Sequence, residues 1–296
     1  MTVISLISCS GAPGVTTSAL ATAAGLTATE VHEPVMIELA SSGGVVASQY
    51  DLPPEPGLTS LALALGNDYP ELLAHAQELP GGLPVVFAPP SGSKTRKLLA
   101  ARSSLLAHYL QDTPATIIAD CGRVSSDTDL LPVLEHSSLV GLVVRPSREN
   151  FHLAATVITE LNDRAEGPLP VGWVLVGRCP WAHDEIVGQY GLPVLSIMAE
   201  DGVGAEAVAG LRRLRRRSPL ARSAQSFADD IAKHLRVTST DAPLGYLDQN
   251  RTNREDVVHP AATGHGEDEA HPADRGHGQE TANRTKLAER PEAPAR

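Results

Sequence analysis

Residues 3–28 read VISLISCSGAPGVTTSALATAAGLTA, and this stretch decides the fold. Its apolar start (3–8) predicts a buried strand, and the Ala- and Leu-rich end (18–28) predicts a helix. A strand, a glycine-rich turn and a helix in this order are typical of a phosphate-binding loop. Such a loop carries a lysine where this chain has Val15. The stretch therefore predicts either a nucleotide site without its usual charge or a tight turn that binds no nucleotide.

Apolar runs that resemble the first strand recur to about residue 235. We expect strands at 3–8, 34–39, 84–89, 115–120, 139–144, 171–176 and 193–198. Helical patterns occupy 18–28, 97–110, 149–163 and 223–235. Continuous β-branched strands that alternate with helices predict an α/β fold, with a doubly wound, mostly parallel sheet and helices on both faces. In such sheets the ligand site lies beyond the carboxyl ends of the strands.

The bulk composition excludes several classes of protein. The net charge of −11 over 296 residues argues against a surface that binds nucleic acid everywhere. No apolar run approaches the length of a membrane span, and the first residues lack the basic segment of a signal peptide, so we expect neither. Cys9, Cys121 and Cys179 have no metal-binding spacing, which suits a reducing cytoplasm.

The composition changes near residue 240, so we predict a folded domain over 1–238 and a disordered, low-complexity tail over 239–296. The tail repeats a 12-residue unit, HPAATGHGEDEA (259–270) followed by HPADRGHGQETA (271–282), with His259, His265, His271 and His277 six residues apart. One interpretation is a loose metal-binding or pH-responsive tract. The other is a duplicated segment without a specific ligand.

The turn keeps part of the chemistry of a phosphate loop. Gly11 and Gly14 allow successive backbone N–H groups to curl around an anion, and Thr16 offers the hydroxyl that binds magnesium. Val15 removes the charge, and Pro13 removes one amide donor. The alternative is an ordinary turn in which Thr17 helps to start the helix.

Several motifs, taken in order, resemble the MinD/ParA family of deviant P-loop ATPases. SGAPGVTT (10–17) aligns without a gap with the family's KGGVGKTT, so its two lysines fall on Ser10 and Val15. The family's acidic motif on the next strand falls on Glu38 and Ala40, and its magnesium-linked aspartate falls on Asp120. The remaining matching segments are 139–161, 191–201 and 218–232. The resemblance implies a P-loop NTPase-like fold.

The resemblance also assigns roles to residues. It implies a site for ATP or ADP with magnesium, although the losses also fit a chain that binds no cofactor. Thr16 and Asp120 would hold the magnesium ion. The cofactor-binding set would be Gly11, Ala12, Gly14, Val15, Thr16, Thr17, Asp120 and Arg178. Ala40 replaces the water-orienting carboxylate, so no catalytic set is intact and Glu38 is the remaining acidic candidate. Gly177 and Arg178 replace the asparagine that reads the base.

Basic side chains follow several predicted strands. These are Lys94, Arg123, Arg145, Arg148 and Arg178. Because a guanidinium binds phosphate bidentately, they could replace the missing lysine and hold a phosphate-bearing ligand weakly. The alternative is that they cap helices or face water.

The strongest basic cluster is LRRLRRRSPLARS (211–223), with Arg212, Arg213, Arg215, Arg216 and Arg217. It suits weak contact with DNA or an anionic membrane surface. The alternative is a solvated helix end whose arginines pair with acidic neighbours.

Three classes of function follow from the resemblance. The first is a positioning or assembly factor for cell division, partitioning or pilus and secretion machinery, like the degenerate TadZ/CpaE type. It would form a homodimer, bind a protein partner and be recruited from the cytoplasm to a membrane site or nucleoid. The second is an active ATPase completed by another subunit. The third is a regulatory partner of a true ATPase that binds no nucleotide.

Overall fold

The computed structural model describes residues 2–11, 13–28, 34–65, 71–211 and 218–238. The strands are β1 (Thr2–Ser8), β2 (Pro34–Glu38), β3 (Gln77–Glu78), β4 (Pro84–Val86), β5 (Thr116–Arg123), β6 (Leu139–Val144), β7 (Val171–Val176) and β8 (Val194–Met198). The longer helices are α1 (Val15–Thr27), α4 (Gly92–Asp112), α6 (Arg148–Arg164) and α9 (Pro219–Thr238). The shorter ones are α2 (Val46–Gln49), α3 (Leu58–Ala64), η1 (Leu72–His75), α5 (Leu131–Glu135), α7 (His183–Tyr190) and α8 (Gly202–Val208).

The strands form one sheet in the order β3-β4-β2-β5-β1-β6-β7-β8. Every neighbouring pair is parallel except β3 and β4, which are antiparallel. The predicted doubly wound, mostly parallel sheet is therefore confirmed. Because β1 lies in the middle of the sheet, the loop that follows it has strands on both sides at the carboxyl edge.

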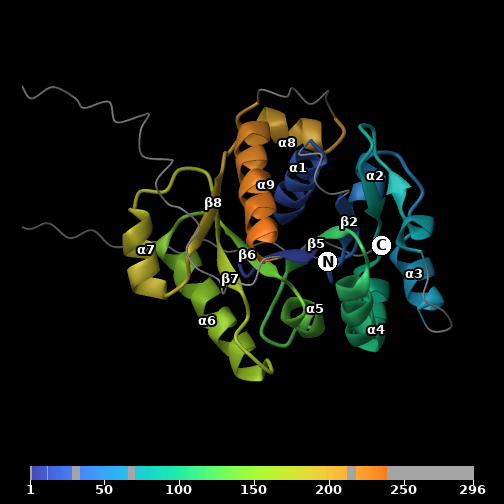
Figure 1. Cartoon of the computed structure of the whole chain (residues 1–296), viewed down its shortest axis with the longest axis horizontal. Coiled ribbons are helices and arrows are strands. Elements are labelled where there is room, and N and C mark those ends of the chain that lie inside the picture. The colour runs from blue at the N-terminus through green and yellow to red at the C-terminus, as the bar shows by residue number, and fades with distance from the viewer. Residues whose placement is uncertain (1, 12, 29–33, 66–70, 212–217, 239–296) are drawn as a thin grey trace, which may run out of the picture. The chain divides into compact units, whose positions relative to one another are not determined.

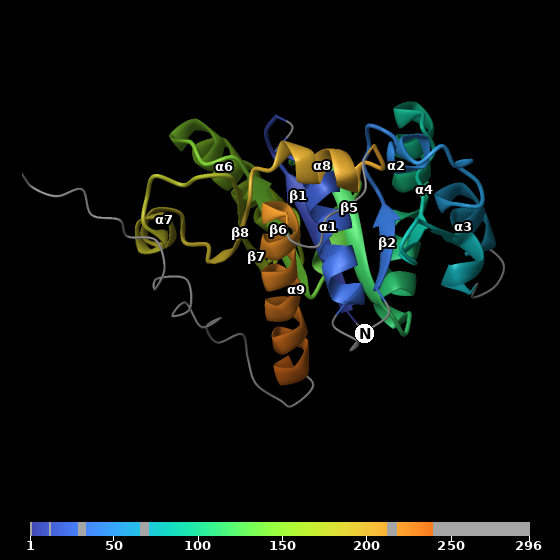
Figure 2. The same cartoon turned by 90° about the horizontal axis from the view of Figure 1, so that it is seen from above.

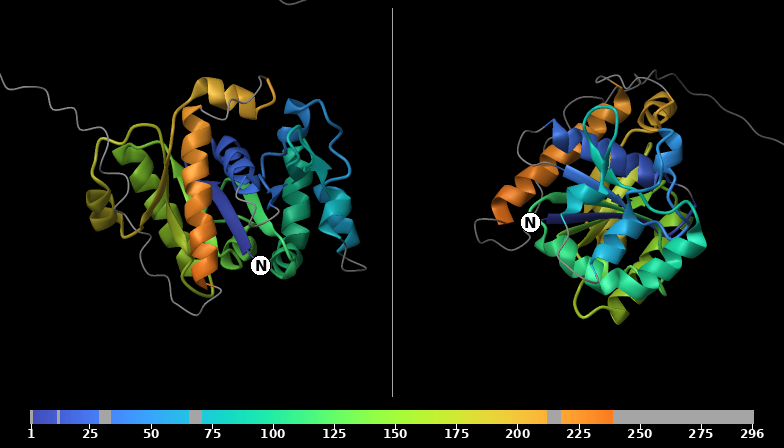
Figure 3. Two further views of the ribbon diagram at one scale, coloured as in Figure 1. Left: turned by 45° about the horizontal axis from the view of Figure 1, so that its top comes forward. Right: turned by 90° about the vertical axis from the view of Figure 1, so that its right-hand side faces the viewer.

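Helices cover both faces of this sheet. Figure 1 shows α1, α8 and α9 on one side and α4, α5 and α6 on the other. From above, α1, α8 and α9 lie in front of the strands (Figure 2). Seen from the edge that carries β3 and β4, the sheet lies between α1 and α9 on one face and α4 on the other (Figure 3, right).

Side chains of each strand alternate between two hydrophobic cores, as the period of two requires. In β1, Val3 and Ile7 belong to the core with α4 and α6, whereas Ile4 and Leu6 belong to the core with α1 and α9. The central strands are buried on both faces, which explains their continuous apolar sequence.

The structure changes several predicted boundaries. The first helix begins at Val15 rather than at residue 18, and α4 begins at Gly92, so Lys94 lies in a helix and not in a loop. Strand β5 continues to Arg123, three residues beyond the predicted end. The sequence reading did not predict β3 or the shorter helices, because elements of a few residues carry too little periodicity. The predicted tail over 239–296 lies outside the described residues and stays a prediction.

Helix α1 packs closely on α9 at Gly25. A Cβ atom added to Gly25 would lie 3.1 Å from the Cβ of Ala228 and 3.2 Å from the carbonyl oxygen of Ala224. Gly25→Leu should therefore separate the two helices and lower the free energy of unfolding by about 1–3 kcal/mol, measured by urea denaturation. Gly188→Leu is the control, because Gly188 is an exposed helical glycine with nothing within 4 Å of an added Cβ. Equal losses in both variants would contradict this account.

Candidate functional site

The parallel sheet brings the ends of its central strands together at one edge. Strand pairing places Leu6 beside Asp120, Ser8 beside Arg123, and Glu38 beside Asp120. The loop after β1 therefore lies next to the carboxylates that end β2 and line β5. The structure thus gathers most of the predicted site residues in one place, although Ala12 lies outside the described residues.

The described part of the loop between β1 and α1 includes two glycines in the left-handed conformation that anion-binding turns use. Gly11 and Gly14 both have positive φ, at 47° and 101°, and Gly14 caps α1. Because Gly14 has no side chain, the N-cap residue does not cap the first N–H groups of α1, which are the groups that bind anions at helix N-termini. Val15 is buried within the α1 and α9 core, so the lysine position contributes packing and no charge.

Thr16 and Asp120 form the predicted magnesium pair. Asp120 is 1% exposed, and its Oδ1 accepts a hydrogen bond of 3.0 Å from the Gly122 amide. Its Oδ2 makes no hydrogen bond with a described residue. Burial raises the pKa of Asp120 to about 6, although the Thr16 hydroxyl lies close enough to lower it in part.

An unpartnered, buried carboxylate oxygen beside a hydroxyl fits a hard cation such as Mg²⁺, which prefers oxygen ligands. Elsewhere, the part of the chain that the structure describes holds no cluster of three or more His, Cys, Asp or Glu side chains suited to a metal ion. The donor set is therefore compatible with magnesium that keeps several waters or phosphate oxygens as its other ligands.

Glu38 organises the neighbouring loops from a buried position. Its Oε1 accepts hydrogen bonds from the amides of Val45 (2.8 Å) and Val46 (3.1 Å), and its Oε2 accepts one from Ala88 (3.2 Å). Burial is the main cause that raises its pKa to about 7, and the nearby Asp120 raises it further, against the three amides. The carboxylate is thus occupied by backbone donors. We interpret Glu38 as a structural residue, and its catalytic role stays a prediction.

Gly44 explains why these loops approach so closely. A Cβ at this position would lie 2.3 Å from the Ala88 carbonyl oxygen and 2.8 Å from Glu38 Oε2, so no larger residue fits without a shift. The Gly44 amide donates to the Pro89 carbonyl at 2.9 Å. The Gly43-Gly44 dipeptide was the sequence signal for this contact, and the sequence reading did not use it.

The position expected to carry a water-orienting carboxylate is apolar. Ala40 is 8% exposed and lies against Gly122, where an added Cβ would be 2.7 Å from the Ala40 Cβ. Near Ala40, the described residues provide two carboxylates: Glu38, which accepts three backbone hydrogen bonds, and Asp120. They provide no other carboxylate that could orient a water molecule.

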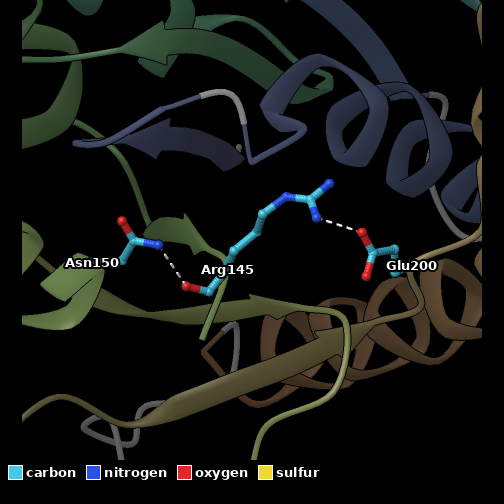
Figure 4. Close-up of polar contacts among 3 residues, drawn as sticks. All are labelled: Arg145, Asn150 and Glu200. Carbon is cyan, nitrogen blue, oxygen red and sulfur yellow. Dashed lines mark hydrogen bonds and ion pairs between the residues drawn. The ribbon is translucent and has the colours of Figure 1, made fainter. Parts of the chain in front are cut away.

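The basic candidates separate into three groups. Arg123 lies beside the loop, because it pairs with Ser8 and its charge acts on the Cys9 thiol. Arg145 forms an ion pair with Glu200 (Figure 4). The other predicted cations are exposed and form no ion pair with a described residue; they are Lys94, Arg148 and Arg178. The cluster of Arg212, Arg213, Arg215, Arg216 and Arg217 lies outside the described residues.

Glu200 is a polar residue at the carboxyl edge that was not predicted from the sequence. Its carboxylate lies over Gly177, where an added Cβ would be 3.1 Å from Glu200 Oε2. The signal was the AED sequence directly after the last strand, where polar residues follow a buried run.

Comparisons with known proteins give a structural answer only. No protein-family model matches the chain. No curated protein matches it in sequence either. Solved structures do match it. A ParA family ATPase from Chlorobium tepidum TLS is 20% identical, with a TM-score of 0.65 over 77% of this chain and 97% of that one.

Two further matches extend the comparison. Cobyrinic acid a,c-diamide synthase from Mycobacterium smegmatis, with bound ATP analogue and magnesium, is 18% identical, with a TM-score of 0.60 over 80% of this chain and 97% of that one. MinD in the MinC:MinD complex from Aquifex aeolicus is 15% identical, with a TM-score of 0.58 over 83% and 99%. The chain therefore has the fold of MinD/ParA-type ATPases. At identities this low the shared fold does not establish the function, which has to be argued from the residues of the site.

The contacts of Glu38 lead to a stability prediction. Glu38→Ala leaves three amides without their acceptor, two of them in buried hydrogen bonds, so the free energy of unfolding should fall by about 2 kcal/mol in urea denaturation. Glu200→Ala removes an exposed carboxylate from the same edge and should cost less than about 1 kcal/mol. A loss for Glu38→Ala as small as that control would show that the amides find other acceptors.

The raised pKa of Glu38 predicts a pH dependence. Between its ordinary value of 4.5 and about 7, folded Glu38 binds more protons than unfolded Glu38. Linkage then makes the free energy of unfolding fall as pH rises through this window and level off above it. Glu38→Gln should flatten this fall relative to the natural chain, measured by urea denaturation between pH 4.5 and 7.5 in buffer with EDTA. Parallel curves for the two proteins would refute the assignment.

Proposed function

We propose that this chain is a MinD/ParA-like P-loop protein that binds a nucleotide with magnesium and hydrolyses it little or not at all. With the nucleotide bound, it would act as a positioning, assembly or regulatory factor. The observation that carries this proposal is the described part of the loop: Gly11 and Gly14 have the positive φ that supports anion binding, while buried Val15 stands where the resemblance places the lysine.

The missing groups are those on which phosphoryl transfer depends. Catalysis of this reaction consists almost wholly of positioning and of neutralising the charge that develops on the phosphate oxygens. Neither Ser10 nor Val15 supplies that charge, and Ala40 cannot orient a water molecule. The three N–H donors on Glu38 leave its carboxylate tied to backbone. We therefore infer that the site favours binding over turnover.

The retained groups support binding. The free N–H groups at the start of α1 would hold phosphate oxygens, with Thr16 and Asp120 on a magnesium ion. Magnesium, when bound, neutralises part of the phosphate charge. Arg123, beside the loop, is the described cation best placed to add to it. ATP and ADP are the reference ligands, since a protein of this fold was solved with an ATP analogue and magnesium.

The cellular role follows from the fold neighbours and from the resemblance. The ParA and MinD neighbours support a role in partitioning or division, and the MinC:MinD complex supports a protein partner. A pilus or secretion role of the TadZ/CpaE type belongs to the same proposal. So do a homodimer, a cytoplasmic chain recruited to a membrane site or nucleoid, and weak DNA or membrane contact through the 212–217 arginines. None of the helices among the described residues is long and apolar enough to cross a bilayer.

An active ATPase completed by another subunit is the second candidate. Gly11 favours it, because this loop residue is exposed. Apart from its chain neighbours, no described atom lies within 4 Å of a Cβ added there, so a cation from another chain could approach the loop at this point. Phosphate release measured with DNA and with anionic vesicles present would separate the candidates. Turnover above that of the Asp120→Asn variant would favour the active enzyme.

Calorimetry tests the proposal directly. We expect ADP or GDP to bind the full chain with a dissociation constant in the micromolar to millimolar range, and to bind more tightly with magnesium than with EDTA. Thr16→Val removes the hydroxyl and keeps the shape, so it should abolish most of the magnesium effect. Thr159→Val, an exposed substitution on α6, is the control. No heat and no shift in melting temperature with either nucleotide would overturn the proposal and favour a regulatory partner without a ligand.

A further inference from the structure

The ion pair of Arg145 and Glu200 has no part in the phosphate site described above. Arg145 directly follows β6, and Glu200 lies two residues after β8, so the two side chains meet across the end of β7 (Figure 4). Their side chains are 53% and 59% exposed. A ligand at the carboxyl edge can therefore reach both without displacing other side chains.

Both residues are held by the helices that follow them. The Arg145 carbonyl accepts a hydrogen bond of 3.0 Å from Asn150 Nδ2, and the Asn150 amide donates to Ser147 Oγ at the start of α6. Glu200 precedes Asp201, whose carboxylate caps α8 by accepting from the Gly204 amide at 2.9 Å. The pair thus has a fixed backbone on each side, which is the condition for reading a ligand edge.

The arrangement of the edge directs a nucleotide base toward this pair. From phosphates bound at the loop after β1, the rest of a nucleotide could extend along the carboxyl edge in two directions, toward β2 or toward β6. On the β2 side, the loop after β2 packs on the segment after β4 through the Gly44–Pro89 hydrogen bond of 2.9 Å. On the other side, β7 lies two strand spacings from β1, about 10 Å, which ribose and phosphates can span. A base bound with its phosphates at the β1 loop would therefore have more room toward β6, β7 and β8.

Gly177 leaves the space in front of the pair open. It directly follows β7 with a φ of 87°, and its amide donates to the Met198 carbonyl at 2.9 Å. A side chain here would meet the Glu200 carboxylate, so glycine keeps that carboxylate accessible.

We propose that Arg145 and Glu200 read the edge of a guanine base, and that the site prefers guanine over adenine nucleotides. This inference rests on the proposed nucleotide site. Guanine presents two acceptors, N7 and O6, followed by two donors, N1–H and the 2-amino group. A guanidinium has only donors and matches N7 and O6, whereas a carboxylate has only acceptors and matches the two donors. Arg145 and Glu200 together therefore match all four of these polar groups on guanine.

Adenine fits the same pair poorly. Its 6-amino group would face the Arg145 donors, and its N1 acceptor would face the Glu200 carboxylate. Each mismatch leaves like groups opposed, which is how a site built for one base rejects the other. A good bidentate contact discriminates bases by a factor of about 5 to 150, and the exposure of this pair places the expected preference near tenfold.

Competition binding tests the inference with the full chain. Fluorescent GDP and ADP, labelled on the ribose, are titrated with magnesium and displaced by unlabelled GDP or ADP. We expect GDP to bind about tenfold more tightly than ADP. Equal affinities, or tighter ADP, would overturn the guanine inference and leave the proposed function standing. Binding of neither nucleotide would overturn both.

Variants of Glu200 separate base reading from a structural role. Glu200→Gln keeps one acceptor and adds an amide donor, so it should weaken GDP at least fivefold. The same variant should bind xanthosine diphosphate more tightly than the natural chain does, because xanthine has an acceptor in place of the 2-amino group of guanine. Asp230→Asn is the matched control, since Asp230 forms an exposed ion pair with Lys233 on α9. An unchanged ratio of GDP to xanthosine diphosphate in Glu200→Gln would overturn the inference.

Discussion

The parallel pairing of β5, β1 and β6 is the constraint on which the rest of the structure depends. It places β1 in the middle of the sheet with Asp120 on one side, and it leaves the loop after β1 between two neighbouring strand ends. Because both faces of these strands are buried, the pairing register cannot slip without exposing one of the two cores. The geometry of the site is thus a consequence of packing and does not require a bound ligand.

Two positions at this site that the resemblance assigns to charged groups are apolar and buried in this chain. Buried Val15 and Ala40 contribute apolar contacts where phosphoryl transfer would need a cation and a carboxylate. Asp120 keeps an oxygen without a donor among the described residues, a costly arrangement that a bound cation would relieve. This combination of groups is the one that the proposed binding without turnover requires. The similar folds at 15–20% identity agree with a frame that tolerates wide changes of sequence.

The carboxyl edge divides into three parts with different physical characters. In the β2 part, the buried Glu38 carboxylate accepts hydrogen bonds from the backbone of two loops and so joins them. The β1 and β5 part has the anion and cation groups. The β6 to β8 part is open, and Arg145 and Glu200 meet there in solvent. The proposed nucleotide matches this order, with its anionic phosphates at the β1 and β5 part and its polar base at the β6 to β8 part.

Much of the architecture was predictable from residues alone. All seven predicted strands exist, because each is a continuous apolar run, and the glycine-rich turn was identified by its position between the first strand and helix. Thr16 was singled out by its place in the glycine-rich turn, and Asp120 by the resemblance to MinD/ParA ATPases. Contacts between segments far apart in the chain were not predictable. The acceptor role of Glu38, the burial of Val15 and Ala40, and the meeting of Arg145 with Glu200, 55 residues away, depend on strand order and register. The sequence by itself determined the repeating strands and helices, since these follow from local periodicity. Only the tertiary structure decided which polar groups share the carboxyl edge, because that depends on long-range packing.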